Sequence, residues 1–170
     1  MVAMKRALIL NSDEIRQKTI RIAYQIVEDN YNTTELTLIG IKLNGFTYAT
    51  KLKSEIEQID KNIKITLLEL ELDKLNPLLK DIKLKPAGSL NKETVIIVDD
   101  VANTGKTLFY ALQPILKFSP AKVQVAVLVD RQHKLYPVSP DFVGLSLSTT
   151  LKEHIVVEFD KKGNGSAYLT

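Results

Sequence analysis

Short apolar runs alternate along this chain with segments whose apolar residues recur at helical spacing, and this alternation restricts the fold more than any other feature. The runs that we expect to form strands span 36–41, 63–70, 94–98, 123–129, 142–147 and 155–159. Helical faces are expected over 15–27, 49–59 and 108–116. Strands that alternate with helices pair in parallel through right-handed crossovers. The pattern therefore predicts an α/β fold with an open, mainly parallel twisted sheet flanked by helices, and ligands at the carboxyl ends of its strands.

The length and composition of the chain indicate a single globular domain. Its 170 residues are 45% hydrophobic and 25% charged, close to the average of folded soluble proteins. We expect this domain to span residues 1–160, with Ser12 as the N-cap of its first helix. The stretch broken by Pro77 and Pro86 is expected to be irregular, and residues 161–170 are expected to form a flexible C-terminal tail.

Residue counts argue against several classes of site and partner. The chain has no cysteine, which removes disulfides, thiolate metal ligands and cysteine nucleophiles, and its 2 histidines argue against a zinc site. No apolar stretch approaches the roughly 20 residues that a membrane-spanning helix needs, so we expect no membrane partner and a cytoplasmic location. The net charge of +3 permits phosphorylated ligands but does not by itself indicate nucleic acid.

Two adjacent acids and a turn of small residues lie in the segment Val95-Ile-Ile-Val-Asp-Asp-Val-Ala-Asn-Thr-Gly-Lys-Thr107. Backbone amides at the start of the following helix bind anions, the threonine hydroxyls add donors, and the glycine allows a phosphate to approach closely. Asp99 and Asp100 would repel each other unless a sugar diol or a hydrated Mg²⁺ shared them. The segment therefore predicts a site for a ribose 5-phosphate.

Three alternatives fit this segment less well. A nucleotide-binding P-loop also ends in Gly-Lys-Thr, but it needs a glycine where this chain has Asp100, whose charge would repel phosphates. A phosphoacceptor domain places an aspartate at a strand end, but it gives no reason for the anion-binding turn that follows. Simple capping of the next helix accounts for one acid rather than for an adjacent pair.

At these residues the chain resembles the type I phosphoribosyltransferases, whose signature is an apolar strand, two acids and a turn that ends Thr-Gly-x-Thr. The segment Gly40-Ile-Lys-Leu-Asn-Gly45 looks like the pyrophosphate loop of that superfamily. The segment Ala126-Val-Leu-Val-Asp-Arg-Gln-His133 is similar to the PyrR-type family of pyrimidine-operon attenuators and uracil phosphoribosyltransferases. The resemblance extends over about 9–159, nearly the whole chain.

The resemblance implies a type I phosphoribosyltransferase fold with a small hood over the base, to which residues 130–137 contribute. It implies an enzyme that transfers the phosphoribosyl group of phosphoribosyl pyrophosphate (PRPP) to a nucleobase, and that works as a homo-dimer or homo-tetramer. Asp99 and Asp100 would hold the ribose hydroxyls and an outer-sphere Mg²⁺ cofactor, and Lys42 would act with them in catalysis. The base would contact Asp130 and Arg131. The implied PRPP-binding residues are Ile41, Lys42, Leu43, Asp99, Asp100, Ala102, Asn103, Thr104, Gly105, Lys106 and Thr107.

One residue of the turn and two loops bear on the substrate and on turnover. Purine-salvage members have an acid at the position of Asn103 that takes a proton from the base, and because an amide cannot do so, uracil is favoured. The family's pyrophosphate loop normally reads Lys-Thr-Arg, where this chain has Leu43 and Asn44 after its lysine. Its mobile loop normally carries an arginine, where this chain offers Lys74 as a point charge.

These motifs and the resemblance leave three functions open. The chain is an active uracil-type phosphoribosyltransferase, a nucleotide-sensing and RNA-binding transcription attenuator, or a relative that binds PRPP but turns it over slowly because donors to the leaving group are lost. RNA binding in the family draws on the first helix, which here offers Arg16, Lys18, Arg21 and Tyr24.

Overall fold

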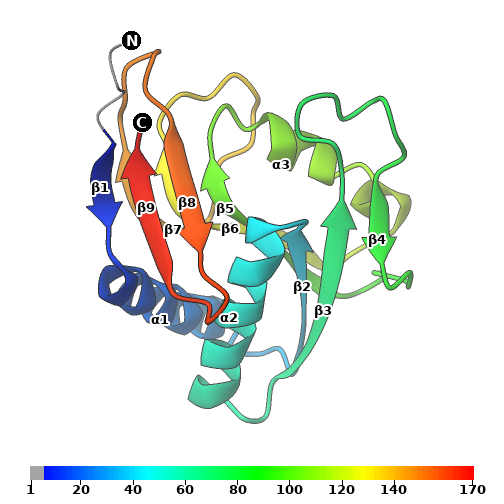
Figure 1. Ribbon diagram of the computed structural model, residues 1–170. Coiled ribbons are helices and arrows are strands. Elements are labelled where there is room, and N and C mark those ends of the chain that lie inside the picture. Colours follow the sequence, from blue (N-terminus) through cyan, green and yellow to red (C-terminus); the bar gives the residue numbers. More distant parts are fainter. Residues whose placement is uncertain (1–5) are drawn as a thin grey trace.

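A computed structural model describes residues 6–170 of the chain. Its elements are arranged as Figure 1 shows and are β1 (Ala7–Leu10), α1 (Ser12–Asp29), β2 (Glu35–Ile41), α2 (Asn44–Ile59), β3 (Lys64–Glu71), β4 (Lys83–Lys85), β5 (Thr94–Ala102), α3 (Lys106–Ala111), a 3₁₀ helix (Ile115–Lys117), β6 (Lys122–Arg131), β7 (Phe142–Leu147), β8 (Ile155–Phe159) and β9 (Gly165–Leu169). None of the helices within residues 6–170 is both long enough and apolar enough to cross a membrane.

Six strands form the central sheet, in the spatial order β4-β3-β2-β5-β6-β7. β3, β2, β5, β6 and β7 run parallel to one another, whereas the edge strand β4 is antiparallel to β3. The predicted α/β fold with a mainly parallel sheet is confirmed. β5 lies inside the sheet and runs to Ala102, beyond the predicted end at 98, so Asp99 and Asp100 belong to the strand and not to the turn that follows it.

Alternate residues of the strands supply two apolar cores, one on each face of the sheet. Ile96 and Val98 of β5 pack with the buried faces of α1 and α2, which lie against each other on that side (Figure 1). Val95 and Ile97 pack on the opposite face, where Leu108 brings in α3. Burial on both faces explains why β5 reads as a continuous apolar run, and it holds the carboxyl end of the strand in a fixed position.

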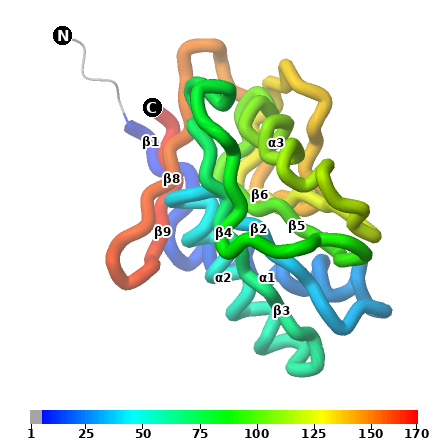
Figure 2. The backbone as a smooth tube through the Cα atoms, turned by 90° about the vertical axis from the view of Figure 1, so that its right-hand side faces the viewer, coloured from blue at the N-terminus to red at the C-terminus, as the bar shows by residue number. Residues whose placement is uncertain are grey.

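A second sheet, which we call the hood, contains β1, β9 and β8 in that order and so joins the first described strand to the last two (Figure 2). Both of its pairings are antiparallel. The predicted flexible tail at 161–170 is wrong for Gly165–Leu169, because this segment is the central strand of the hood and its Ala167 is fully buried. The hood is therefore built by the chain ends.

Residues 132–137, which were expected in the hood, form a loop that packs on the turn after β5 instead. The amides of Leu135 and Tyr136 donate to the carbonyl of Thr104 at 2.9 and 3.0 Å. This loop therefore supports the turn from outside rather than covering a base.

The first helix begins with a reciprocal pair of hydrogen bonds. Asn11, and not the expected Ser12, is the N-cap: its Oδ1 accepts from the amide of Glu14 at 2.9 Å. Glu14 Oε2 accepts from the amide of Asn11 at 2.8 Å, which completes a capping box. The preceding strand β1 ends at Leu10, so the cap also fixes the junction between the hood and α1.

The other two helices also differ from the predicted ranges. α2 begins at Asn44, earlier than the apolar pattern from 49 indicated, because its first turn packs through Gly45 rather than through a large side chain. α3 ends at Ala111, and the predicted helix is completed only by the separate 3₁₀ helix after Pro114, whose ring cannot continue an α-helix.

Candidate active site

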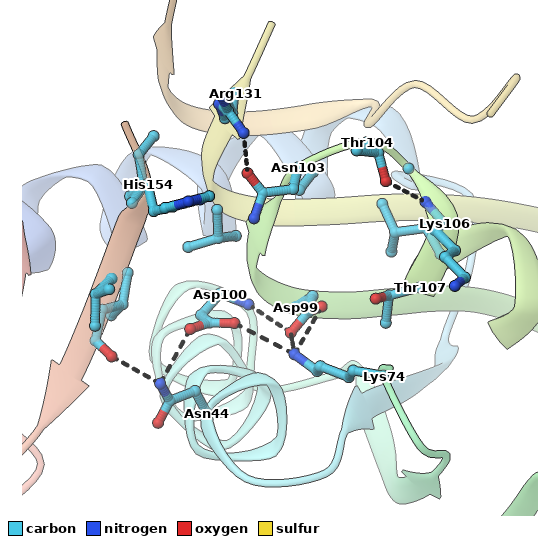
Figure 3. Close-up of a pocket in the computed structure, with 17 residues that line it drawn as sticks. Asn44, Lys74, Asp99, Asp100, Asn103, Thr104, Lys106, Thr107, Arg131 and His154 are labelled. Carbon is cyan, nitrogen blue, oxygen red and sulfur yellow. Dashed lines mark hydrogen bonds and ion pairs between the residues drawn. The ribbon is translucent and has the colours of Figure 1, made fainter. Parts of the chain in front are cut away.

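A pocket of about 480 Å³ opens at the carboxyl end of β5, between the end of β6 and the start of β8 (Figure 3). Figure 3 shows three groups of polar residues around it: the acids with Lys74 and Asn44, the turn after β5, and Arg131 with Asn103 and His154. Its wall comprises Asn44, Lys74, Asp99, Asp100, Val101, Ala102, Asn103, Thr104, Gly105, Lys106, Thr107, Leu108, Arg131, His154, Ile155, Val156 and Val157. The pocket lies where the sheet was predicted to bind its ligand.

The two acids of β5 lie deep in this pocket. The side chain of Asp99 is 1% exposed and that of Asp100 is 10% exposed. Burial, together with the neighbouring charge of Asp100, raises the pKa of Asp99 well above its usual range, although Lys74 opposes the shift. The amide of Asp100 donates to Asp99 Oδ1 at 3.0 Å, which fixes the first carboxylate against the strand.

Gly45 allows the first turn of α2 to lie directly against these acids. A Cβ atom at this position would be 2.8 Å from Asp99 Oδ1 and 2.9 Å from the carbonyl oxygen of Val98. Both atoms are held by β5 and cannot move away. The glycine is therefore required by the close approach of α2 to the end of β5.

Lys74, from the loop after β3, contacts both acids. Its Nζ lies 3.1 Å from Asp99 Oδ1, 3.2 Å from Asp99 Oδ2 and 3.8 Å from Asp100 Oδ1. Burial alone would lower the pKa of Lys74, but the attraction of the two carboxylates outweighs it and the pKa is raised. The sequence suggested Lys74 as a replacement for a loop arginine, and the structure places it on the acids themselves.

Asn44 connects the acids to the hood. Its Nδ2 donates to Asp100 Oδ2 at 3.0 Å and to the carbonyl oxygen of Val157 in β8 at 2.8 Å. From the sequence, Asn44 is notable only because it stands where the family's pyrophosphate loop has an arginine. Its amide instead orients Asp100 and ties β8 to the central sheet.

The turn between β5 and α3 lines the side of the pocket next to the acids. Gly105 has a φ of 83°, a conformation that favours glycine, and this allows the chain to reverse tightly before α3. The amide of Lys106 points toward Thr104 Oγ1 at 3.4 Å, and the side chain of Thr107 faces the pocket (Figure 3). All the predicted turn residues, 102–107, lie along this wall. Successive backbone amides in such a turn form a concavity suited to a phosphate.

Arg131 and Asn103 form the opposite side of the pocket. Arg131 is 5% exposed, and its guanidinium donates to Asn103 Oδ1 at 3.4 Å and to the carbonyl of Thr150 at 2.8 Å. Asp130, the second residue predicted to contact a base, is not in the pocket wall, because its carboxylate pairs with Lys134 on the loop after β6. Of the two predicted base contacts, the structure thus brings only Arg131 to the pocket.

His154 is a pocket residue that the sequence did not indicate. It immediately precedes β8, and its amide and carbonyl pair with the backbone of Thr170 at 2.8 Å each. Its position depends on how the two ends of the chain meet in the hood, and a local pattern carries no such information. Once β9 is known to pair with β8, the side chain just before β8 becomes a candidate for ligand contact.

The residues predicted to hold pyrophosphate, 41–43, do not line this pocket. Ile41 is fully buried in the core, and the ammonium of Lys42 forms an ion pair with Glu71 at the end of β3. Leu43 is 76% exposed and has a φ of 70°, which is unusual for a side chain with a Cβ atom. The loop has a strained backbone of the kind found at ligand sites, but its predicted catalytic lysine is directed elsewhere.

The acid pair fits a Mg²⁺ ion that arrives with a ligand. Among residues 6–170 there is no group of three or more histidines or acids that could hold a metal ion without help. Mg²⁺ is commonly held by one or two carboxylates, with water and substrate phosphates supplying the remaining oxygens. Asp99 and Asp100 provide that number of carboxylates next to the turn suited to a phosphate.

Known proteins resemble this chain over nearly its whole length. The phosphoribosyl transferase domain family matches residues 7–162. A protein named Bifunctional protein PyrR from Fusobacterium nucleatum is 38% identical over 163 residues, which cover 91% of this chain and 91% of that protein. The protein of the same name from Staphylococcus haemolyticus is 32% identical over 173 residues and covers 98% of this chain and 99% of its own length.

Solved structures give the same fold. The hypoxanthine phosphoribosyltransferase of Trypanosoma cruzi superimposes with a TM-score of 0.77 at 19% identity and covers 95% of both chains. A hypoxanthine-guanine phosphoribosyltransferase of Bacillus anthracis gives a TM-score of 0.75 at 19% identity and covers 98% of this chain and all of its own. With the family match over nearly the whole chain, these findings show that the protein belongs to the type I phosphoribosyltransferases and, within them, to the PyrR family.

Proposed function

We propose that this protein binds PRPP with Mg²⁺ in the pocket at the end of β5 and transfers the phosphoribosyl group to uracil. The observation that carries this proposal is the arrangement of a buried acid pair beside an anion-binding turn. Asp99 and Asp100 offer acceptors for a sugar diol, and the turn of residues 102–107 offers donors for a phosphate on the same sugar. A ribose 5-phosphate carries both groups at the required proximity.

The residues would act mainly by position and charge. A ring nitrogen of the base attacks C1 of the ribose, the bond from C1 to the pyrophosphate oxygen breaks, and pyrophosphate leaves with the bonding electrons. The proton of the nitrogen passes to the pyrophosphate or to water. Mg²⁺, when bound, supplies positive charge to the leaving pyrophosphate. Asp99 and Asp100 hold the ribose, and Arg131 faces the position where the base would lie. Holding two reactants in line in this way accounts for a large part of such a barrier.

The polar groups around the pocket favour a pyrimidine. The two acids of the pocket wall, Asp99 and Asp100, lie at the sugar end, and the position that carries an acid in purine-salvage members is Asn103. A neutral amide does not take a proton from a 6-oxopurine, but it hydrogen-bonds well to a carbonyl or an imide of uracil. The guanidinium of Arg131 adds donors for a pyrimidine carbonyl.

A base panel with pyrophosphate detection tests this proposal. We expect Mg²⁺-dependent release of pyrophosphate from PRPP with uracil and little with hypoxanthine or guanine. Turnover with a purine but not with uracil would contradict the substrate assignment. Binding of PRPP without turnover with any base would support the slow relative, in which arginine donors to the leaving group are lost at Asn44 and in the loop that carries Lys74.

Substitution of the acids tests whether the site is correctly located. The double change Asp99→Asn and Asp100→Asn should weaken PRPP binding by more than about 100-fold, because each carboxylate loses charge-assisted hydrogen bonds of about 1.5–3 kcal/mol. Asp81→Asn, an exposed acid outside this pocket, is the matched control and should bind as the wild type does. An unchanged affinity in the double variant would place the donor elsewhere.

Binding of a pyrimidine-operon transcript is the second candidate function. It is supported by membership in the PyrR family and by the exposed residues Arg16 and Tyr24 on α1. Arg21 is less available, because its guanidinium donates to the carbonyl of Gly144 at 2.6 Å. Sequence-selective binding of a leader transcript that weakens steeply with salt would support this function, and binding equal to that of an unrelated RNA would contradict it.

We further propose a homo-dimer or homo-tetramer and a cytoplasmic location. Both are expectations that rest on membership in the phosphoribosyltransferase family. Analytical ultracentrifugation over a range of concentrations tests the first expectation, and a purely monomeric protein would contradict it.

A further inference from the structure

The strongest unexplained feature of the pocket is the position of Lys74 on the two acids. We propose that Lys74 is an internal counter-ion that closes the sugar end of the pocket and that the bound donor and its metal replace it. This inference rests on the proposed function for the identity of the ligand, but the contact that carries it is a property of the chain alone.

Lys74 binds the carboxylate oxygens of Asp99 that would accept hydrogen bonds from a ribose diol. Its Nζ lies within hydrogen-bond distance of both carboxylate oxygens of Asp99, at 3.1 and 3.2 Å. Asp99 is otherwise enclosed by protein, with a side chain only 1% exposed. The face that Lys74 covers is therefore the face from which a ligand would reach this carboxylate, so the ligand and Lys74 compete for it.

Local hydrogen bonds hold Lys74 in this position. Asp73 Oδ1 accepts from the amides of Leu75 and Asn76 at 2.9 and 3.0 Å, which folds the backbone tightly around Lys74. The carbonyl of Leu75 in turn accepts from Lys106 Nζ at 3.2 Å. The loop is thus attached at two points, to the acids through Lys74 and to the predicted phosphate turn through Lys106.

Each attachment involves a group that the donor would engage. Ribose hydroxyls and Mg²⁺ compete with Lys74 for the acids, and a 5-phosphate in the turn attracts the ammonium of Lys106 away from a neutral carbonyl. Binding of the donor therefore releases both attachments. Lys74 therefore leaves the acids when the ligand enters and returns to them when it leaves.

The charges explain why the acids need one cation or another. Two adjacent carboxylates, both largely buried, repel each other strongly without a positive partner. Lys74 supplies one positive charge, and its side chain is 43% exposed, so it is free to leave toward solvent. A Mg²⁺ ion that arrives with the donor supplies the positive charge that Lys74 gives up, so a cation faces the acids before and after the exchange.

Calorimetry with two probes tests this inference. The first probe is uridine 5′-monophosphate with Mg²⁺, which carries the diol and the 5-phosphate but no pyrophosphate that a freed lysine could hold. The second is Mn²⁺ alone, which the two acids would bind weakly, with water completing its coordination. We expect Lys74→Gln to bind each probe about 10-fold more tightly than the wild type, which corresponds to about 1.4 kcal/mol. Lys80→Gln, from the exposed part of the same loop, should bind within about twofold of the wild type.

The outcomes separate this inference from the proposed function. If Lys74→Gln gains affinity for Mn²⁺ but neither protein binds the nucleotide, Lys74 is the counter-ion and the phosphoribosyl site is wrong. If both proteins bind the nucleotide and Mn²⁺ with equal affinity, the site stands and the counter-ion role is refuted.

Selective methylation of lysines in the wild-type protein gives a result even where the variant folds poorly. We expect Lys74 to react more slowly than Lys80 in the protein without added ligand, and to react faster once the nucleotide and Mg²⁺, or Mn²⁺ alone, are added. Equal reactivity of the two lysines before addition would refute the inference.

Discussion

The substitution Gly45→Ala probes how closely α2 must approach the acids, and the structure sets its magnitude. The added Cβ atom would lie 2.8 Å from Asp99 Oδ1, 2.9 Å from the oxygen of Val98 and 3.1 Å from Ile41 Cβ. Ordinary contacts of this kind begin at 3.4 Å, so the first turn of α2 would have to retreat by about 0.6 Å. The atoms that it meets belong to the rigid strands β2 and β5 and cannot retreat in its place.

Overpacking of this kind costs roughly 1–3 kcal/mol, while alanine is favoured over glycine within a helix by up to about 1 kcal/mol. We therefore predict that the free energy of unfolding falls by about 1–2 kcal/mol, which lowers the melting temperature by about 2–8 °C in a chain of this size. Urea unfolding followed by circular dichroism measures the first quantity and a thermal scan the second.

Gly88→Ala is the matched control for this prediction. A Cβ atom at Gly88 meets nothing within 4 Å, and the position lies in an exposed loop. This change should leave stability unaltered or raise it by up to about 1 kcal/mol, because the unfolded chain loses freedom. If the two variants are equally stable, α2 is not held against Asp99 in the way the structure indicates.

Three further predictions concern the core, the edge of the sheet and the hood. Tyr48→Phe should raise the free energy of unfolding by about 1 kcal/mol, because the buried hydroxyl has no hydrogen-bond partner among the described residues; a loss of that size by urea unfolding would contradict this. Lys42 and Lys85 lower the pKa of Glu71 to about 2, so its pairing stabilises the fold above pH 4.5 and is lost as the pH falls toward 2. The difference in urea midpoint between Glu71→Gln and the wild type should therefore be larger at pH 6 than at pH 3, and a difference independent of pH would refute the pairing. Truncation after Asp160 removes β9 and should lower the melting temperature by more than about 4 °C, whereas a truly flexible tail could be removed without effect.

The parts of this structure that the sequence predicted well are those determined by neighbouring residues. β5 and the following turn combine a β-branched run, two acids and a glycine within one short segment, and each of these features has a local physical consequence. The pocket forms there because the carboxyl ends of parallel strands meet at one edge of the sheet. Asp99, Asp100 and the turn therefore lie together as expected.

The parts that the sequence did not predict depend on distant partners. β9 contains Gly165 and Ala167, residue types that are depleted in strands, and it becomes a strand because β1 and β8 pair with it from both sides. Lys42 was expected at the ligand, but its ammonium forms an ion pair with Glu71 on the neighbouring strand. Lys74 could be recognised as a candidate cation, yet its contact with Asp99 depends on how its loop folds back over β5.

A crystal structure of the protein soaked with PRPP and Mg²⁺ would show whether the pocket at the end of β5 holds the donor. We expect density for the 5-phosphate within the turn of residues 102–107, ribose hydroxyls within hydrogen-bond distance of Asp99 and Asp100, and Lys74 withdrawn from both acids. Density for the donor at any other surface, or a fully occupied donor in a pocket where neither acid contacts the sugar, would contradict it.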